Sequence, residues 1–152
     1  MAKNAVYFED MVPGVVEEGP SVTVDRQELV SFAERWDPMP FHVDEKAGKA
    51  AFGGLTAPGI YVLALKQRLI HKLPIPHAVF ASFGYDEVRF HEPVRPGDRL
   101  TLVVEWVERK VSRSKPDRGI VKVRYSLRNQ SEVIVMSHFD TILVGRRSRE
   151  DT

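Results

Sequence analysis

The chain has 152 residues, enough for one domain with a sizeable core, and its composition is that of an ordinary globular protein. Its 22 basic and 21 acidic side chains nearly cancel, so no general attraction to nucleic acid or to a membrane surface is implied. The absence of cysteine excludes disulfides, thiolate metal sites and cysteine nucleophiles. Neither a signal peptide nor an apolar run of about 18 residues is present, so we expect a cytoplasmic protein with no membrane span.

The N-terminal part of the chain combines a short strand with a helix. Residues 15–24 are rich in valine and predict a strand interrupted by a Gly-Pro pair. Asp25 stands three residues before Glu28, which resembles a capping box, and apolar residues at helical spacing then predict a helix that runs to Trp36. Pro38 is expected to end this helix, because proline disfavours helical geometry in the residue before it.

Two more helical segments follow before the pattern changes. Asp44 is interpreted as the cap of a short helical segment that begins at Glu45 and runs to residue 51. Residues 60–73 form the most apolar helix candidate and end at two closely spaced prolines. The first turns of this helix are apolar nearly all round, as expected of a helix buried against a sheet or in an interface.

From residue 78 onward the apolar residues recur with a period of two, which is typical of strands. The predicted strands are 79–83 and 85–90, which are two short strands or one long one, then 100–111, 120–127 and 133–144. Helices followed by strands joined by tight turns indicate an α+β fold with an antiparallel sheet. We expect a single domain over residues 1–152, with a core of about 7–145 and a polar, frayed tail at 146–152.

The most informative stretch runs from Asp37 to Gly59. The Asp37 carboxylate and the His42 imidazole stand five residues apart in a loop stiffened by two prolines, and a glycine-containing turn then opens the apolar helix. A carboxylate and an imidazole can hold and activate one water, while a backbone N–H at a helix N-terminus can stabilise an oxyanion. Taken alone, Asp37 is more often a turn or helix-capping residue, and a lone histidine such as His42 is more often structural. Their joint occurrence at this spacing, followed by the glycine turn, favours an acid–base pair.

Two other groups of polar residues carry weaker predictions. The remaining histidines lack partners at metal-ligand spacing, so no metal site is predicted; they are His71, His77, His91 and His138. The basic loop 112–119 is either a solvated hairpin loop or, through Arg113, Lys115 and Arg118, an aid to binding phosphates at a pocket mouth.

Three motifs resemble those of the MaoC-like dehydratases and (R)-specific enoyl-CoA hydratases: Asp37-x-x-Pro40-x-His42-x-Asp44, Phe52-Gly53-Gly54 with Ala57-Pro58-Gly59, and Pro93-Val94-Arg95-Pro96-Gly97-Asp98. The resemblance covers roughly residues 7–145. It implies the hotdog fold, in which a curved antiparallel sheet wraps a long central helix. It also implies a homodimer or a dimer of dimers, with an acyl-CoA or acyl-carrier-protein thioester bound between subunits.

By this resemblance Asp37 and His42 would be the catalytic pair and Gly59 the oxyanion donor. The substrate-binding positions would be Met39, Phe52, Gly53, Gly54 and Pro58. The chain departs from the family pattern in three places. Met39 replaces an asparagine, Pro58 replaces a histidine or serine, and Gln67 stands where some members have an auxiliary serine.

The implied reaction is reversible syn addition of water to a trans-2-enoyl thioester, giving a 3-hydroxyacyl thioester. No cofactor is expected apart from the coenzyme A that forms part of the substrate. Two alternatives stay open: a non-catalytic acyl-CoA-binding or accessory hotdog subunit, which Met39 favours, and a hotdog thioesterase. Thioesterases of this fold often take a carboxylate from the central helix, and residues 60–73 contain neither Asp nor Glu.

Overall fold

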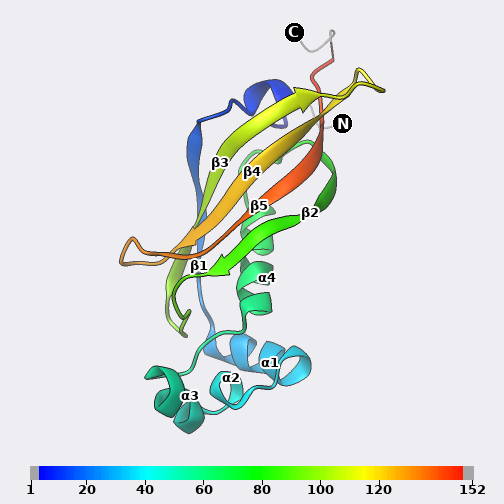
Figure 1. Ribbon diagram of the computed structural model, residues 1–152. Helices are drawn as coiled ribbons and strands as arrows, with labels where there is room; N and C mark the ends of the chain where they lie inside the picture. The colour runs from blue at the N-terminus through cyan, green and yellow to red at the C-terminus, as the bar shows by residue number, and fades with distance from the viewer. Residues whose placement is uncertain (1–3, 149–152) are drawn as a thin grey trace.

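Five antiparallel strands form one curved sheet in the order β1-β3-β4-β5-β2 (Figure 1). The computed structural model describes residues 4–148. The strands are β1 (Val16–Thr23), β2 (Val79–Phe90), β3 (Arg99–Val111), β4 (Arg118–Arg128) and β5 (Ile134–Gly145). The α+β class with an antiparallel sheet is therefore confirmed.

The alternating pattern of the C-terminal half builds the core. In β3 the residues Leu100, Leu102, Val104 and Trp106 share one face and are almost completely buried. Alternation of this kind gives a sheet one apolar face, which must be covered by another element. The helix α4 (Gly59–Ile70) provides that cover, with its own buried residues directed at the sheet (Figure 1).

Strand β2 is one long strand rather than two. Gly84 lies at its centre with φ 144°, and its pairing with β5 shifts register in three places. A glycine tolerates this backbone conformation at no steric cost, so the strand bends there without ending. β2 is an edge strand and carries exposed large apolar side chains, which are Val79, Phe80, Phe83, Tyr85 and Phe90.

The four α-helices lie between β1 and β2 in the chain, and two predicted details are wrong. They are α1 (Arg26–Trp36), α2 (Pro40–Val43), α3 (Glu45–Phe52) and α4, after the 3-10 helix η1 (Phe8–Asp10). The capping box does not form, because the Glu28 carboxylate accepts a 2.7 Å hydrogen bond from the Tyr61 hydroxyl. α4 ends at Ile70 rather than at residue 73, because the Lys72 and Leu73 N–H groups donate to carbonyls only three residues back and Pro74 disfavours helical geometry at Leu73.

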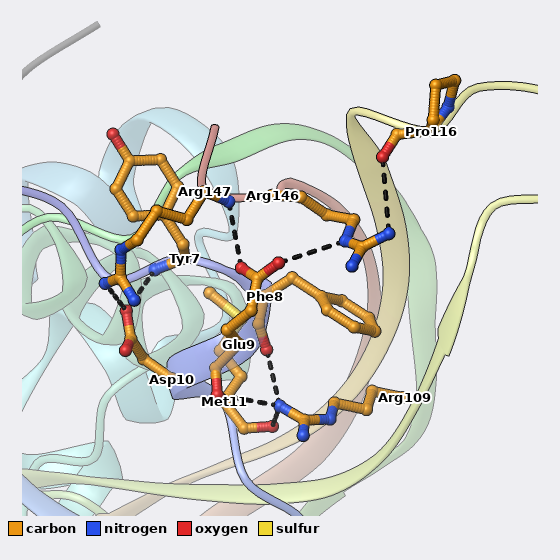
Figure 2. Close-up of polar contacts among 9 residues, drawn as sticks. All are labelled: Tyr7, Phe8, Glu9, Asp10, Met11, Arg109, Pro116, Arg146 and Arg147. Carbon is orange, nitrogen blue, oxygen red and sulfur yellow. Dashed lines mark hydrogen bonds and ion pairs between the residues drawn. The ribbon is translucent and has the colours of Figure 1, made fainter. Parts of the chain in front are cut away.

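The tail was expected to fray from residue 146, and its first two residues are instead fixed (Figure 2). The Arg146 guanidinium lies 3.1 Å from a Glu9 carboxylate oxygen, and the Arg147 backbone N–H donates to the other at 3.0 Å. Arg147 also pairs with Asp10 at 2.6 Å. Arg109 donates to the Phe8, Glu9 and Met11 carbonyls at the end of η1. The rest of the predicted tail, 149–152, lies outside the described residues.

No helix within residues 4–148 is long and apolar enough to cross a membrane.

Candidate active site

Asp37 and His42 are brought together by two helix boundaries. Asp37 is the C-cap residue of α1, and its backbone N–H donates to the Ala33 carbonyl before Pro38 stops the helix. Pro40 opens α2 at its first position, where a missing N–H costs nothing. Two residues later His42 points inward and is only 7% exposed. The two prolines therefore set the geometry that the sequence predicts for this pair.

The His42 ring is held in one orientation. Its Nδ1 lies 2.6 Å from the Thr56 carbonyl oxygen, which can only accept, so Nδ1 carries the proton of the neutral ring. Nε2 is then the basic nitrogen, and it lies 3.5 Å from Asp37 Oδ2. This separation is long for a direct hydrogen bond but suits a water that contacts both groups. The Asp37 side chain is 38% exposed, so its carboxylate faces solvent while the His42 ring is buried.

Gly59 is the first residue of α4, and it lines the same cavity as His42, so the N-terminus of α4 faces that cavity. The first-turn N–H groups of a helix have no partner within it and carry its positive dipole end. The Phe90 ring lies against Gly59, and a Cβ at this position would stand 2.6 Å from the ring Cζ. Glycine is therefore required for this close approach.

A cavity of about 380 Å³ is lined by His42 and Gly59 but not by Asp37, which lies beside His42 outside the lining. Three of the site residues predicted from the sequence line this cavity, namely His42, Phe52 and Gly59. Its other walls are mostly apolar and come from the start of α4, the segment after β2, and β5. A mainly apolar pocket with a few convergent polar groups is the usual form of a small-molecule site. Among residues 4–148, no group of three or more His, Asp or Glu side chains is placed to hold a metal ion.

The other predicted binding residues lie outside the cavity lining. Gly53 ends α3 in the left-handed conformation, with φ 76°. A Cβ on Gly54 would stand 2.8 Å from Arg95 Nη1, so the glycine pair makes room for this guanidinium, which donates to the Phe52 carbonyl. Met39 is the N-cap residue of α2 and is 46% exposed, and Pro58 is the N-cap residue of α4. Asp44 caps α3 as predicted, accepting from the Ala47 N–H at 3.0 Å.

Sequence reasoning missed the residues that complete the site. Thr56 fixes His42 through a backbone atom, which no side-chain motif reveals. Phe90, His91 and Glu92 come from the end of β2 and reach the cavity only because the sheet curves back over α4. The one feature of the sequence that pointed to this segment was the Pro-Val-Arg-Pro-Gly-Asp turn at residues 93–98, which directly follows these three residues. Of the predicted basic loop 112–119, residues 112–117 connect β3 to β4 at the opposite end of the sheet from α1–α3 (Figure 1), and Arg118 begins β4. None of these residues lines the cavity.

Comparisons with known proteins agree with this architecture. Residues 8–128 match the model of the MaoC-like domain. The chain is 32% identical over 141 residues to an uncharacterised protein, YdeM, of Bacillus subtilis, covering 91% of this chain and 99% of YdeM. A MaoC-like dehydratase from Rhodospirillum rubrum superposes with a TM-score of 0.86 at 30% identity, covering 93% of this chain and 98% of that one. The (R)-hydratase PhaJ1 of Pseudomonas aeruginosa gives a TM-score of 0.75 at 22% identity, covering 95% and 88%.

The fold is thus the hotdog fold, with a carboxylate, an imidazole and a helix N-terminus gathered at one end of its central helix. The chain belongs to the MaoC-like domain family.

Proposed function

We propose that the protein is an acyl dehydratase or hydratase that adds water reversibly to a trans-2-enoyl thioester. The observation that carries this proposal is the 3.5 Å gap between Asp37 Oδ2 and His42 Nε2 beside the N-terminus of α4. Hydration of an enoyl thioester needs a base for water, a proton for the α-carbon and a donor for the thioester oxygen. The three groups match these three needs.

In the proposed reaction one water lies beside Asp37 and His42 and contacts both. Its oxygen attacks the β-carbon while His42 Nε2 takes one of its protons. The imidazolium then returns this proton to the α-carbon, so both parts of water add from the same side. Asp37 accepts the second hydrogen bond of the water and stabilises the imidazolium. The Gly59 N–H donates to the thioester oxygen, where enolate charge develops in the transition state.

The thioester carrier is proposed to be coenzyme A or acyl carrier protein, and the working unit a homodimer or a dimer of dimers. The edge strand β2 supports the dimer, because it presents unpaired backbone groups together with exposed aromatic residues, of which Phe83 is 62% exposed. An exposed apolar edge of this kind is a template for pairing with another chain. No other cofactor takes part in the proposed reaction.

A panel of trans-2-enoyl-CoA thioesters of increasing chain length tests the proposal directly. Hydratase activity removes the enoyl absorbance and leaves the thioester intact. Thioesterase activity releases free thiol instead, and a binding or accessory subunit produces neither change while still binding the ligand. Absence of hydration across the whole panel, by protein that is folded and binds acyl-CoA, would refute the proposed function.

A further inference from the structure

Residues 53–58, which join α3 to α4, carry the backbone groups on which the candidate active site depends. The Thr56 carbonyl accepts from His42 Nδ1, and the segment leads directly into Gly59, which opens α4. A shift of this segment would therefore move the group that orients the imidazole together with the proposed oxyanion donor. Whatever fixes the segment consequently affects both parts of the proposed reaction.

Two attachments hold the ends of this segment, and both come from residues of the turn before β3. The Ala57 N–H donates to the Val94 carbonyl at 2.8 Å. At the other end the Arg95 guanidinium donates through Nη2 to the carbonyl of Phe52, the last residue of α3. One backbone bond and one side-chain bond thus tie the segment to the turn.

The turn that carries Arg95 is itself fixed on both sides. Within it, the Arg95 N–H donates to Asp98 Oδ2 at 2.9 Å. Asp98 Oδ1 accepts from Gln130 Nε2 at 3.0 Å, on the loop between β4 and β5. Val24, just after β1, exchanges backbone hydrogen bonds of 2.8 and 2.9 Å with Asp98 and Gly97. Arg95 therefore acts from a rigid base that belongs to the sheet.

The guanidinium is held at a cost that stability alone does not explain. A Cβ on Gly54 would stand 2.8 Å from Arg95 Nη1, so the guanidinium lies directly against the backbone of the segment. Nη1 is buried and has no hydrogen-bond partner among residues 4–148. Leaving a buried donor unpaired costs about 1–3 kcal/mol, and more on a charged group. This cost indicates that the arginine serves the site rather than the stability of the fold.

Phe52 also reaches His42 through its ring. The Phe52 and Phe41 ring centroids are 5.1 Å apart, and those of Phe41 and His42 are 4.6 Å apart, both pairs meeting edge to face. The Thr56 N–H donates to the Phe41 carbonyl at 3.2 Å. The place of Phe52 is thus passed to the imidazole by a ring contact as well as along the backbone.

We infer that Arg95 is a positioning residue of the candidate active site. Its bond to the Phe52 carbonyl fixes the segment, and the Thr56 carbonyl in turn keeps the proton of the neutral His42 ring on Nδ1. Arg95 lies outside the cavity lining and acts through these two residues. The catalytic part of the inference rests on the proposed hydratase function, whereas the effect on the His42 tautomer does not.

Imidazole ¹⁵N NMR tests the tautomer without reference to catalysis. At mildly alkaline pH the wild-type His42 ring should show a protonated Nδ1 and an unprotonated Nε2, with its signals assigned by their loss in His42→Ala. Arg95→Met keeps an unbranched side chain but removes the donor, and it should convert this pattern to a mixture of tautomers. Denaturant unfolding checks that the variant is folded.

Activity supplies the second readout. Arg95→Met should lower kcat for an enoyl-CoA substrate on the order of 10- to 100-fold, as expected when a catalytic group is misplaced by about 1 Å, and should change KM much less. Millimolar methylguanidinium should restore part of the kcat of Arg95→Ala, because it supplies the missing donor to the Phe52 carbonyl. It should leave the wild-type rate unchanged.

Arg109→Met is the matched control. Arg109 also donates to backbone carbonyls at the end of a short helix, but at η1, remote from the cavity (Figure 2). The variant should keep both the His42 tautomer and kcat, even where it loses stability. A loss of the tautomer in Arg109→Met as large as in Arg95→Met would show a general loosening of the fold and would overturn the inference.

Gly54→Ala tests the same contact from the other side, and it carries the test should Arg95→Met fail to fold. The added methyl group expels the guanidinium and leaves the arginine in the chain. It should reproduce the tautomer mixture and the loss of kcat, and it should add little in an Arg95→Met background.

The outcomes separate this inference from the proposed function. A folded Arg95→Met protein with the wild-type His42 tautomer overturns the inference, whatever its activity. A wild-type protein that hydrates no thioester, but whose His42 tautomer depends on Arg95, overturns the proposed function and leaves the positioning role intact.

Discussion

The Phe90 ring rests directly on Gly59, the first residue of the central helix. The contact joins the end of the edge strand β2 to the helix N-terminus that is proposed to bind the thioester oxygen. Phe90 is 52% exposed, so its outer face is free to meet substrate or a partner subunit. The position of this ring therefore couples the cavity wall to the proposed oxyanion donor.

Gly59→Ala should impair the proposed reaction through Phe90. The added methyl group keeps the N–H but forces the ring away, and a displacement of about 1 Å near reacting groups can lower a rate by about 100-fold. We expect kcat/KM for an enoyl-CoA substrate to fall about 10- to 100-fold. Unfolding free energy should change by no more than about 1 kcal/mol, because alanine favours helix and the ring can turn toward solvent.

A double-mutant cycle isolates the coupling. In a Phe90→Ala background there is no ring to displace, so Gly59→Ala should have little additional effect on kcat/KM. Equal losses in both backgrounds would show that the methyl group acts on the substrate itself.

Asp37→Asn and His42→Ala should each lower kcat by at least about two orders of magnitude, since general acid–base catalysis is typically worth 10²–10⁴-fold. The double variant should be little worse than either single variant, because the two groups act as one unit on one water. Steady-state hydration assays measure the rates, and binding of a saturated acyl-CoA should survive in all three proteins.

Asp44→Ala is the control in the same loop. It removes the cap of α3 and should cost about 1 kcal/mol of stability, with kcat retained within a few-fold. If both catalytic-pair variants kept most of their kcat, the assignment to Asp37 and His42 would be wrong, and Asp44 or His91 would be the next candidates.

Local chemistry allowed much of the fold to be predicted from the sequence. Pro38 ends α1 and Asp44 caps α3 through interactions within a few residues, and the alternation in β3 sets its buried face. The Asp37–His42 pair was predictable for the same reason, since both residues are held by the two prolines of one loop. The predicted capping box does not form because the Glu28 carboxylate accepts a hydrogen bond from Tyr61 of α4, a residue 33 positions away in the chain.

The unpredicted parts of the site depend on contacts between distant segments. Thr56 acts through its carbonyl, whose direction is set by the backbone path rather than by residue type. The role of the Gly53–Gly54 pair depends on Arg95, which arrives from the turn before β3. Lys66 is the first of three consecutive polar residues in α4, and only the packing against the sheet shows that it is buried near Tyr85 and Asp140.

Lys66→Met should change how stability depends on pH. The pKa of Lys66 is lowered by burial from 10.5 to about 8, so between these values the unfolded chain binds the extra proton and the folded chain does not. The wild-type protein should therefore gain stability relative to Lys66→Met as pH rises from 8 to 10.5, by on the order of 3 kcal/mol. Tyr61, whose pKa is raised by burial and by its hydrogen bond to Glu28, titrates alike in both proteins.

Denaturant unfolding of the two proteins at a series of pH values measures this difference. At neutral pH the methionine variant should be the more stable one, because it no longer buries a charge. Parallel curves for the two proteins from pH 7 to about 10 would show that Lys66 has an ordinary pKa in the folded state.

Phe83→Lys should convert the proposed dimer to a monomer. Phe83 is 62% exposed at the middle of β2, so a two-fold pairing of this strand brings the two copies of position 83 close together. Two lysines there would repel each other and would replace apolar contact area, and charged residues are a common means of blocking edge pairing.

Light scattering at micromolar concentration should give a dimer for the wild-type chain and a monomer for the variant. Val111→Lys, at an exposed apolar position on β3, should remain dimeric. Because the family resemblance implies a thioester bound between subunits, hydratase activity should fall with the dimer fraction upon dilution. A wild-type chain that is monomeric and fully active at micromolar concentration would contradict the proposed dimer.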